Sequence, residues 1–395
     1  MSKKKMYWML SFVIFTFTLL AVVIVYEVNE YKNRTVKVMD ENNNLIDSDA
    51  DGEEIEDEFN TDDELTNGDS NINPDATPDV TEEEEDKEIT MVFTGDIYLS
   101  NYVTSAYDKE GINGIVSKEL LDELSNADVT MANQEFAFSN RGTAAPDKQF
   151  TFRLSPTYIS TFLDMGIDIA TLANNHTLDF GRDALLDSID TLRENNIAYV
   201  GAGEDITRAR ETKYMDVKGK NIAFLAASRV IPVTEWNATS TSPGLFTTYD
   251  PTALIEEIKS AKDKSDFIVV YVHWGLERKS YPEEYQRKLA QQYIDAGADI
   301  VIGSHPHVLQ GVEYYNGKPI IYSLGNFIFN NNIEQTAILK VVLTKDSEVK
   351  VYLLPCKAVN AKTSFMDKSL YDSFYTYMED ISYGVSFHEG EAINK

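Results

Sequence analysis

The sequence predicts an α/β domain that follows a single transmembrane helix and a disordered acidic linker. Three observations support this prediction: an uncharged apolar run near the N-terminus, a long segment rich in Asp and Glu, and strand-like and helical stretches that alternate from about residue 89 onward. The 395 residues, 43% of them hydrophobic, provide enough apolar surface for one large domain or two ordinary ones.

The first 26 residues have the composition of a membrane anchor. Met1–Lys5 carries three lysines, and Met6–Tyr26 is a run of 21 residues without a charge. A helix of that length spans a hydrocarbon core about 30 Å thick. A cleavable signal peptide is the alternative, but its apolar region is usually shorter and ends in small residues, unlike Val22–Tyr26. Because the lysines precede the span, we expect an uncleaved anchor with a cytoplasmic N-terminus and an extracytoplasmic main domain.

Residues 27–88 form the predicted linker. They contain 24 acidic and four basic side chains, a net charge of −20. Such a segment cannot bury enough apolar surface to fold, so it is interpreted as a tether; binding of cations or basic partners is the less favoured alternative. The acidity of the whole chain, with a net charge of −30, argues against nucleic acid as a partner.

Strand-like and helical stretches alternate through the first part of the globular region. The predicted helices lie near residues 117–124, 156–165, 184–194, 251–262 and 282–296. The predicted strands lie near residues 90–94, 129–132, 167–172, 198–200, 222–227, 268–272 and 299–302. This alternation predicts a mainly parallel sheet covered by helices.

After Ser304 the pattern changes to strands joined by short turns such as Asn316-Gly317. The predicted strands are 308–314, 318–323, 335–343 and 348–354. They indicate an antiparallel, meander-like second sheet within the same domain. A final helix over 368–381 is expected to pack on the body. The resulting domain boundaries are 1–26 for the cytoplasmic stub and anchor, 27–88 for the linker, 89–355 for the main domain and 356–395 for the C-terminal extension.

Histidines and carboxylates gather at the ends of predicted strands. Four of the five histidines are so placed: His176, His273, His305 and His307. Asp96 and the segment Asn133-Gln134-Glu135 occupy equivalent positions, whereas His388 lies in a polar tail. Sites in open α/β sheets form beyond the carboxyl ends of the strands, so we expect these residues at one edge of one sheet.

Each of these residues has a simpler interpretation when taken alone. A histidine at a strand end is more often a hydrogen-bonded loop residue than a ligand, Asn174-Asn175 can form a turn, and Asp96 can cap a helix. In His305-Pro306-His307, alternation along an extended chain points both imidazoles the same way, which suits two ligands of one cluster. Because the simpler interpretations require five segments to converge by coincidence, a shared site is favoured.

The residue types at these positions predict the chemistry of the site. Carboxylate, amide and imidazole ligands without a thiolate favour Mn, Fe or Zn over Ca or a structural zinc. Two such ions about 3.5–4 Å apart can activate water and stabilise an in-line displacement at phosphorus. A histidine beside a ligand Asn, but not itself a ligand, is well placed to protonate a leaving group.

The motifs at these strand ends resemble those of the CapA, or poly-γ-glutamate capsule biosynthesis, family, a branch of the calcineurin-like metallophosphatase fold. The matching segments are Thr94–Asp96, Asn133–Glu135, Ala173–His176 with Asp179-x-Gly181, Gly201–Gly203, His273–Gly275, His305–Val308 with Gln310, and Tyr322–Phe327. They cover about residues 89–330. The resemblance implies a four-layer α/β/β/α sandwich and a role in capsule polymer biosynthesis or export, commonly of poly-γ-glutamate.

The resemblance also implies roles for single residues. Metal-ligand positions are matched by Asp96, Asn175, His273, His305 and His307. His176 matches the general acid, and Glu135 stands where the broader metallophosphatase pattern has a bridging Asp. The chain departs from that pattern at Tyr98, where the first motif has a His ligand, and at Asn174, where it has Gly.

Further residues are candidates for orienting the acid or binding substrate. Asp179 is placed to orient His176 or, equally, to cap the helix that follows it. Arg153 is a candidate for an anionic substrate, with a surface ion pair as the alternative. Asn133 and Asn326 are also candidates for substrate binding, although Asn326 can instead close a turn.

Two functions follow from this site. The first is a hydrolase or transferase that uses two divalent ions, with His176 as acid, on phosphoester, amide or polymer-terminal bonds at the outer membrane face. The second is a non-catalytic part of a capsule export assembly that binds a polymer end. Both imply the capsule polymer, other membrane capsule-synthesis proteins and the membrane itself, through residues 6–26, as partners. From Ile89 onward the chain has 41 acidic and 28 basic residues, which disfavours loose electrostatic attraction of a polyanion.

Overall fold

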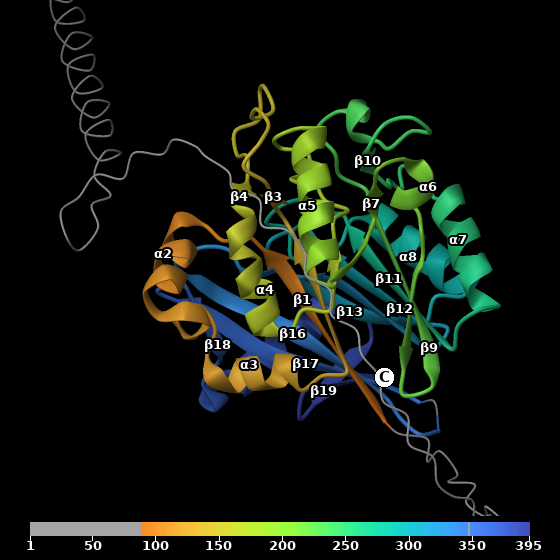
Figure 1. Ribbon diagram of the computed structural model, residues 1–395. Helices are drawn as coiled ribbons and strands as arrows, with labels where there is room; N and C mark the ends of the chain where they lie inside the picture. The colour runs from red at the N-terminus through yellow and green to blue at the C-terminus, as the bar shows by residue number, and fades with distance from the viewer. Residues whose placement is uncertain (1–87, 347) are drawn as a thin grey trace, which may run out of the picture. The chain divides into compact units, whose positions relative to one another are not determined.

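Two β-sheets stacked face to face form the centre of the computed structural model (Figure 1). The structure describes residues 88–346 and 348–395, which lie within the compact unit Val80–Lys395. The predicted anchor and, apart from Glu88, the predicted linker lie outside the described residues. Within the described ranges, no helix combines the length and the apolar character needed to cross a membrane.

The larger sheet has ten strands. Their order is β19-β20-β17-β16-β1-β2-β5-β6, and β15 pairs with β1 while β18 pairs with β17. The strands are β1 (Ile89–Ile97), β2 (Val129–Gln134), β5 (Ile169–Thr171), β6 (Ala198–Val200), β15 (Asn326–Ile328), β16 (Ile333–Leu343), β17 (Val349–Val359), β18 (Lys362–Phe365), β19 (Val385–His388) and β20 (Glu391–Asn394). β1, β2, β5 and β6 are parallel, whereas β16 runs antiparallel to β1.

The smaller sheet has six strands in the order β13-β14-β12-β11-β9-β8. The strands are β8 (Lys213–Val217), β9 (Lys220–Ser228), β11 (Phe267–His273), β12 (Ile300–Ser304), β13 (Leu309–Tyr315) and β14 (Lys318–Leu324). β9, β11, β12 and β14 are parallel, and β8 and β13 are antiparallel edge strands. β11 is buried along its whole length, which explains its continuous apolar sequence: a parallel strand covered on both faces has no solvent side.

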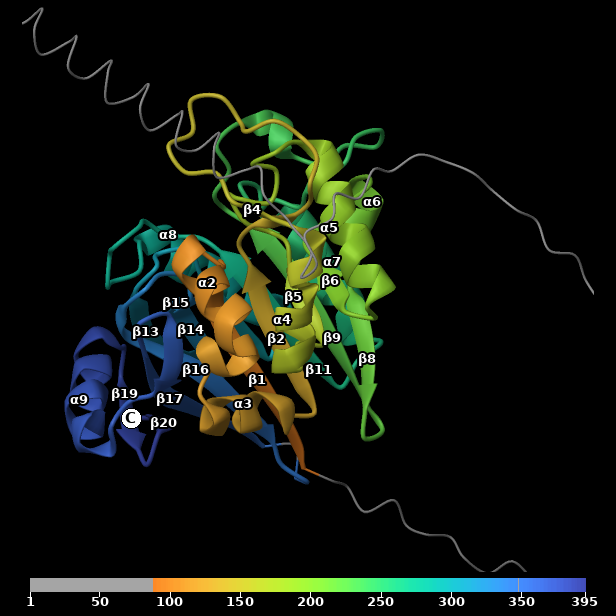
Figure 2. The ribbon, with the colours of Figure 1, turned by 60° about the vertical axis from the view of Figure 1, so that its left-hand side comes forward.

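The helices lie outside the two sheets (Figures 1 and 2). The α-helices are α2 (Asn101–Glu110), α3 (Lys118–Ser125), α4 (Ser160–Met165), α5 (Arg182–Glu194), α6 (Ile206–Ala209), α7 (Thr252–Lys262), α8 (Glu284–Ala296) and α9 (Tyr371–Ile381). Short 3-10 helices lie at Gly111–Gly114, Pro156–Ile159, Thr234–Trp236 and Lys368–Leu370. Two small pairs, β3 (Ala137–Phe138) with β4 (Arg153–Leu154) and β7 (Ala202–Gly203) with β10 (Gly244–Leu245), complete the elements.

Three apolar clusters hold these layers together. One lies between the sheets and joins, for example, Phe93 of β1 to Phe224 of β9. A second joins α2, α3, α4 and α5 to the outer face of the larger sheet, and a third joins α7 and α8 to the outer face of the smaller one. Each fully buried Leu, Ile or Phe in these clusters contributes about 1.5–3 kcal/mol. The layers therefore follow the order helix, sheet, sheet, helix.

The α/β class and most predicted elements are confirmed, but the division into sheets is corrected. The sequence predicts one mainly parallel sheet followed by a separate antiparallel one, whereas both sheets are mixed. Strands after Ser304 extend both: β13 and β14 belong to the smaller sheet, and β16 to β20 belong to the larger. The reason is that strand pairing is non-local, since β16 hydrogen-bonds to β1 at the opposite end of the domain sequence.

The C-terminal segment is more regular than the sequence indicates. α9 buries Phe374, Met378 and Ile381 against the core between the sheets. The polar tail around His388 forms the hairpin β19–β20, which was not predicted. The predicted boundary between residues 355 and 356 falls inside β17, and β18 to β20 continue the larger sheet.

Candidate metal centre

Strand ends from both sheets meet at the candidate metal centre. In the larger sheet, Asp96 of β1 is in register with Asn133 of β2 and with Asn326 of β15, and Glu135 follows β2 directly. In the smaller sheet, His273 is the last residue of β11. The carboxyl ends of parallel strands share one edge of a sheet, and here two such edges face each other. The sequence predicted convergence on one sheet edge; the structure corrects this to the edges of two stacked sheets.

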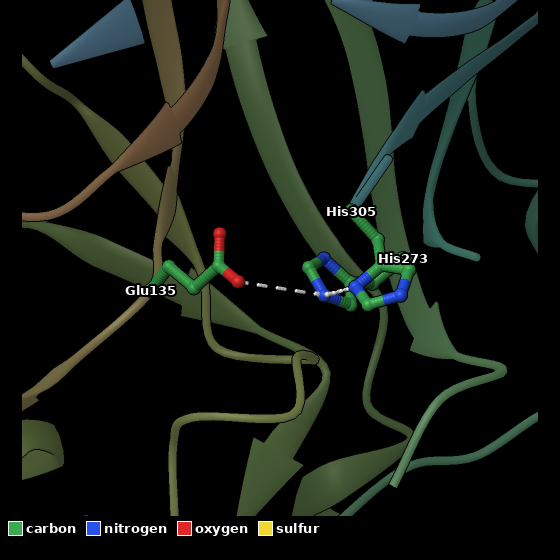
Figure 3. A group of neighbouring side chains, drawn as sticks. All are labelled: Glu135, His273 and His305. Carbon is green, nitrogen blue, oxygen red and sulfur yellow. Dashed lines mark hydrogen bonds and ion pairs between the residues drawn. The ribbon is translucent and has the colours of Figure 1, made fainter. Parts of the chain in front are cut away.

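The converging side chains form two groups. Glu135, His273 and His305 make up the first, and Asp96, Glu135 and His307 make up the second. In each group, one potential ligand atom from every residue lies within 4.8 Å of the others. Oε1 of Glu135 is 3.8 Å from Nε2 of His273 and 3.8 Å from Nε2 of His307; Figure 3 shows Glu135 pointing toward His273 and His305. Glu135 thus belongs to both groups, as a carboxylate that bridges two metal ions would.

The environment of Glu135 fits a metal ligand. Both carboxylate oxygens are buried, and neither has a hydrogen-bond partner among the described residues. Burial, together with the negative charge of Asp96, raises the pKa of Glu135 well above its usual range. A buried carboxylate without donors is costly unless a cation compensates it. The set of carboxylate, imidazole and amide donors without thiolate suits Mn, Fe or Zn.

Asp96 and His307 form an ion pair in the second group. Oδ2 of Asp96 lies 3.2 Å from Nδ1 of His307, and Oδ1 accepts a hydrogen bond from Nδ2 of Asn133 at 2.8 Å. Burial opposes charge on both partners, but their attraction outweighs it. The pKa of Asp96 therefore falls below its ordinary value, and the charges of Glu135 and Asp96 raise the pKa of His307 to about 10.

The other two histidines of the groups are neutral. Nε2 of His273 lies 3.1 Å from Nδ1 of His305 and 2.6 Å from Oδ1 of Asn175. Burial and the neighbouring histidines hold the pKa of His273 well below its usual range and lower that of His305 to about 3. Neutral imidazole is the form that binds metal ions. Asn175 thus lies beside the first group, at the position where a ligand amide was predicted.

The His305-Pro306-His307 segment reaches the site by a bend and not by an extended strand. β12 ends at Ser304, and His305 and His307 both have positive φ angles, 97° and 60°. Positive φ is sterically unfavourable for residues other than glycine and is concentrated at functional sites. The expectation that strand alternation aligns the two imidazoles is therefore wrong. The bend brings both rings to the cluster instead, with centroids 5.8 Å apart.

His176 and Asp179 form a pair beside the two groups. Nδ1 of His176 is 2.6 Å from Oδ2 of Asp179, and Nε2 is 3.9 Å from Oε1 of Glu135. Burial lowers the pKa of His176, and the hydrogen bond that its ring donates to Asp179 offsets part of that effect. The alternative that Asp179 caps the following helix is wrong: Gly181 is the N-cap residue of α5, and Asp179 accepts from the backbone N–H of Phe152 at 2.6 Å.

A family model for bacterial capsule synthesis protein PGA_cap matches residues 90–331, which contain both groups and the His176–Asp179 pair. The chain belongs to this family. The capsule biosynthesis protein CapA of Bacillus anthracis is 32% identical to it over 259 residues, covering 64% of this chain and 62% of that protein. The PGA biosynthesis protein CapA of Bacillus subtilis (strain 168) is 32% identical over 276 residues, covering 68% of this chain and 72% of that protein.

Among solved structures, this PGA_cap family member is similar to the "Putative 5′-Nucleotidase" from Staphylococcus aureus. The TM-score is 0.44 and the sequence identity is 16%, and the match covers 74% of this chain and 58% of that chain.

Lys148 is a site residue of this PGA_cap protein that sequence reasoning missed. It comes from the loop between β3 and β4, and its ammonium group contacts the Asp179 carboxylate, the Asn175 carbonyl oxygen and, at 3.1 Å, Nδ1 of His176. Its side chain is 15% exposed. Burial lowers its pKa, an effect that the charge of Asp179 opposes. A single lysine in a loop carries no local pattern, so only tertiary structure places it here.

An aromatic stack stands beside His176. The Phe152 ring lies on His176 with centroids 4.1 Å apart, and Tyr98 lies on the other side of Phe152 at 3.9 Å. Tyr98 occupies the position at which the metallophosphatase pattern has a ligand His. In this PGA_cap protein that side chain therefore packs against the ring that orients His176.

Asn174, the second departure from the broader pattern, is buried in a hydrogen-bond network. Its Nδ2 donates to Oδ1 of Asn133 at 3.0 Å and to the backbone oxygen of Gln134 at 2.7 Å. Its Oδ1 accepts from the backbone N–H of His176 at 3.0 Å. The side chain thus links the segment before Glu135 to the segment that carries His176. A glycine has no side chain for this role.

The remaining candidates are divided between the site and its surroundings. Oδ1 of Asn326 lies 2.8 Å from Nδ1 of His307, so Asn326 borders the second group. Arg153 donates to the backbone oxygens of Arg141 and Gly142, and its guanidinium lies over the ring of Phe180 at 4.1 Å. The structure does not bring Arg153 into either group.

Proposed function

We propose that this protein is a metal-dependent hydrolase or transferase of a capsule polymer, with a metallophosphatase-like site for two ions. The observation that carries the proposal is the buried Glu135 carboxylate, shared between two ligand groups and without a hydrogen-bond partner in the described region. The family and the relatives named for capsule and PGA biosynthesis support a poly-glutamate polymer as the substrate class. The order of the layers agrees with the sandwich that the resemblance implies.

The proposal assigns each ligand group to one ion. In the first group, His273 and His305 would hold one ion; in the second group, Asp96 and His307 would hold the other. Glu135 lies between the two groups, and Asn175 lies beside His273. Divalent ions held by these residues would supply Lewis acidity, which activates water and stabilises charge that develops at the atom under attack. Bonds compatible with this chemistry are phosphoesters, amides and the terminal bonds of a polymer.

His176 is assigned to proton donation. Its Nε2 faces the Glu135 side of the site, while Asp179 on Nδ1 stabilises the protonated ring and fixes its orientation. Because burial lowers the pKa of His176, its protonated form is a stronger acid than ordinary imidazolium. Such a residue can give a proton to a departing alkoxide or amine. Residues 6–26 would anchor the domain to the cell membrane, with the site on the outer side.

A non-catalytic polymer-binding component of an export assembly is the second candidate. It is favoured by Tyr98, because this residue removes one ligand that the metallophosphatase pattern supplies and packs on Phe152 instead. A site with fewer ligands can still capture a carboxylate or phosphate end of a chain.

Hydrolysis of p-nitrophenyl phosphate by the full chain, purified without chelator, tests the catalytic proposal. We expect metal-dependent turnover that His176→Ala reduces about 100-fold or more while metal content stays unchanged. His388→Ala is the matched control, because His388 is exposed in β19 and is expected to have wild-type activity. If His176→Ala leaves capsule production intact in cells while His305→Ala abolishes it, the binding function replaces the catalytic one.

A further inference from the structure

A cavity opens directly beside the second ligand group. Its volume is about 340 Å³, and its lining includes His307 and Asn326, whose side chains are 2.8 Å apart. This size lies near the lower end of the range of about 300–1,000 Å³ found for small-molecule sites. A molecule that reaches the ligand group from this side therefore has room for a short segment and not for a large ring system.

The lining is rich in primary amides and hydroxyls. Asn326, Asn330, Asn332 and Gln335 supply four carboxamides, and Ser280 and Tyr377 supply two hydroxyls, 3.2 Å apart. The lining contains no Lys or Arg; its ionisable side chains other than Tyr377 are Glu334 and His307, and His307 is paired with Asp96. A carboxamide offers both a donor and an acceptor, so it matches the N–H and C=O of a secondary amide.

The strand that forms one wall is irregular at this point. On β16, Ile333 pairs with Ala358 of β17 and Thr336 pairs with Cys356, so two residues, Glu334 and Gln335, face a single residue of β17. This is the geometry of a β-bulge, which disrupts the ladder locally and redirects side chains, often beside active sites. The bulge therefore lies where the wall of the cavity is built.

Gln335 carries an unused donor. Its Nε2 atom is buried and has no hydrogen-bond partner among the described residues, although Gln335 lines the cavity. An unpaired buried donor is unfavourable for folding alone. A ligand carbonyl in the cavity would supply the missing acceptor after a small rotation of the side chain.

We propose that this amide-lined cavity is a substrate subsite that binds the amide backbone of a polyamide chain whose reacting end lies at the candidate metal centre. The inference rests on the proposed function, since it treats the cavity as part of the same site. Uncharged donors and acceptors select the repeating amide, while the absence of Lys and Arg from the lining leaves the side-chain carboxylates of the polymer directed to solvent.

The residues that line the cavity come from both sides of the end of the family match. The family model ends at residue 331, whereas Asn332, Gln335 and Tyr377 lie beyond it. One wall of the cavity is therefore built by the segment shared with the family, and the other by β16 and α9. The cavity therefore combines residues of the segment matched by the family model with residues beyond it.

Binding of γ-linked tetraglutamate to the full chain, measured by isothermal titration calorimetry, tests this subsite. We expect Gln335→Leu to weaken binding about fivefold or more, the effect of one lost hydrogen bond, and to leave metal content unchanged. Because Leu removes an unpaired buried donor, the melting temperature should not fall. Asn330→Ala, at an exposed loop residue, is a second variant with the same expected direction. Gln292→Leu, at an exposed position on α8, is the matched control and should bind like the wild type.

The possible results separate the subsite from the proposed function. Metal-loaded Gln335→Leu and Asn330→Ala that bind tetraglutamate like the wild type would overturn the subsite and leave the function standing. Binding of maltotetraose but not tetraglutamate would overturn the polyamide assignment in favour of a glycan. A wild-type protein that holds no metal would overturn the proposed function. The subsite would still be supported if the wild type and Gln292→Leu bind tetraglutamate and the Gln335→Leu and Asn330→Ala variants do not.

Discussion

At the scale of single residues, the site is a concentration of buried charge that the rest of the domain avoids. Glu135 and Asp96 are fully buried, and Lys148 and Asp179 meet in a contact that is almost closed to solvent. Buried charges cost free energy unless each has a partner. Asp96, Lys148 and Asp179 form hydrogen bonds within the protein, whereas Glu135 accepts none among the described residues, and Nε2 of His307 lies 3.8 Å from its Oε1. A bound cation would complete the set.

Glu135→Gln tests this residue as a bridge. The amide keeps the shape of the carboxylate but removes the charge that two ions share, so we expect metal content to fall from about two ions per chain to fewer than one. Inductively coupled plasma mass spectrometry of the full chain gives the measurement. Glu256→Gln on α7, at an exposed position, controls for the loss of one negative charge. Unchanged metal content in Glu135→Gln would contradict the shared-ligand model.

Asp179→Asn tests the Lys148–Asp179–His176 contacts. The substitution leaves the Lys148 ammonium buried without its carboxylate, so we expect the free energy of unfolding to fall by about 3 kcal/mol. Urea unfolding of the single variant and of the double variant Asp179→Asn/Lys148→Met checks this. The double variant should regain part of the loss, because it no longer buries an unpaired cation. Equal stability of Asp179→Asn and wild type would show that the contact contributes nothing.

At the scale of elements, the position of Asp96 depends on a very close approach between β1 and the turn before β15. A Cβ atom added at Gly95 would lie 1.9 Å from the backbone oxygen of Gly325. That oxygen accepts a hydrogen bond from the N–H of Asp96 at 2.9 Å. Glycine at position 95 is thus required by the close approach of β1 to the turn before β15, and this approach fixes the backbone position of Asp96.

Gly95→Ala tests the close approach. The added methyl group must push the two backbones apart, so we expect a loss of about 3 kcal/mol or more in stability and a loss of bound metal as Asp96 shifts. Gly317→Ala is the comparison: its Cβ would meet open space, and only its φ of +74° makes alanine unfavourable, by about 1 kcal/mol. Thermal unfolding and metal analysis of both variants decide the matter. A similar cost at the two positions would argue against a constrained approach of the two backbones.

The elements themselves were largely predictable from the sequence. Continuous apolar runs such as Phe267–His273 and the helical pattern of α5 depend on neighbouring residues, and both appear in the structure close to their predicted bounds. α2 was missed because its sequence, Asn101–Glu110, buries only Val103 and so has almost no apolar stripe. The hairpin β19–β20 was missed because each of its strands has only four residues, too few for an apolar pattern to stand out.

At the scale of the whole molecule, the candidate site belongs to neither sheet alone. β1, β2 and β15 deliver Asp96, Asn133, Glu135 and Asn326, and β11 and β12 lead to His273, His305 and His307. The apolar cluster between the sheets holds the two edges at a fixed separation. Because each ligand group takes side chains from both sheets, changes in that cluster should alter the distances within each group as well as stability.

Deletion of residues 27–88 tests whether the site depends on the acidic segment. All residues of the two ligand groups lie between 96 and 307, so we expect the deletion variant to keep the metal content of the full chain. Its expected effect is on cellular location or reach toward partners, because the deletion shortens the predicted tether. Metal analysis and fractionation of cells expressing each form provide the measurements. Loss of metal on deletion would show that the acidic segment contributes to the site.

The sequence by itself determined the α/β class, most of the helices and strands, and the residues of the two ligand groups. These features depend on local periodicity and on residue type, which a single chain displays directly. Only the tertiary structure decided how the strands divide between two sheets, how the positive φ angles of His305 and His307 turn both rings inward, and that Lys148, Asn174 and Phe152 contact His176. The physical reason is that these features arise from contacts between segments distant in the chain, whose energies appear only when the segments pack together.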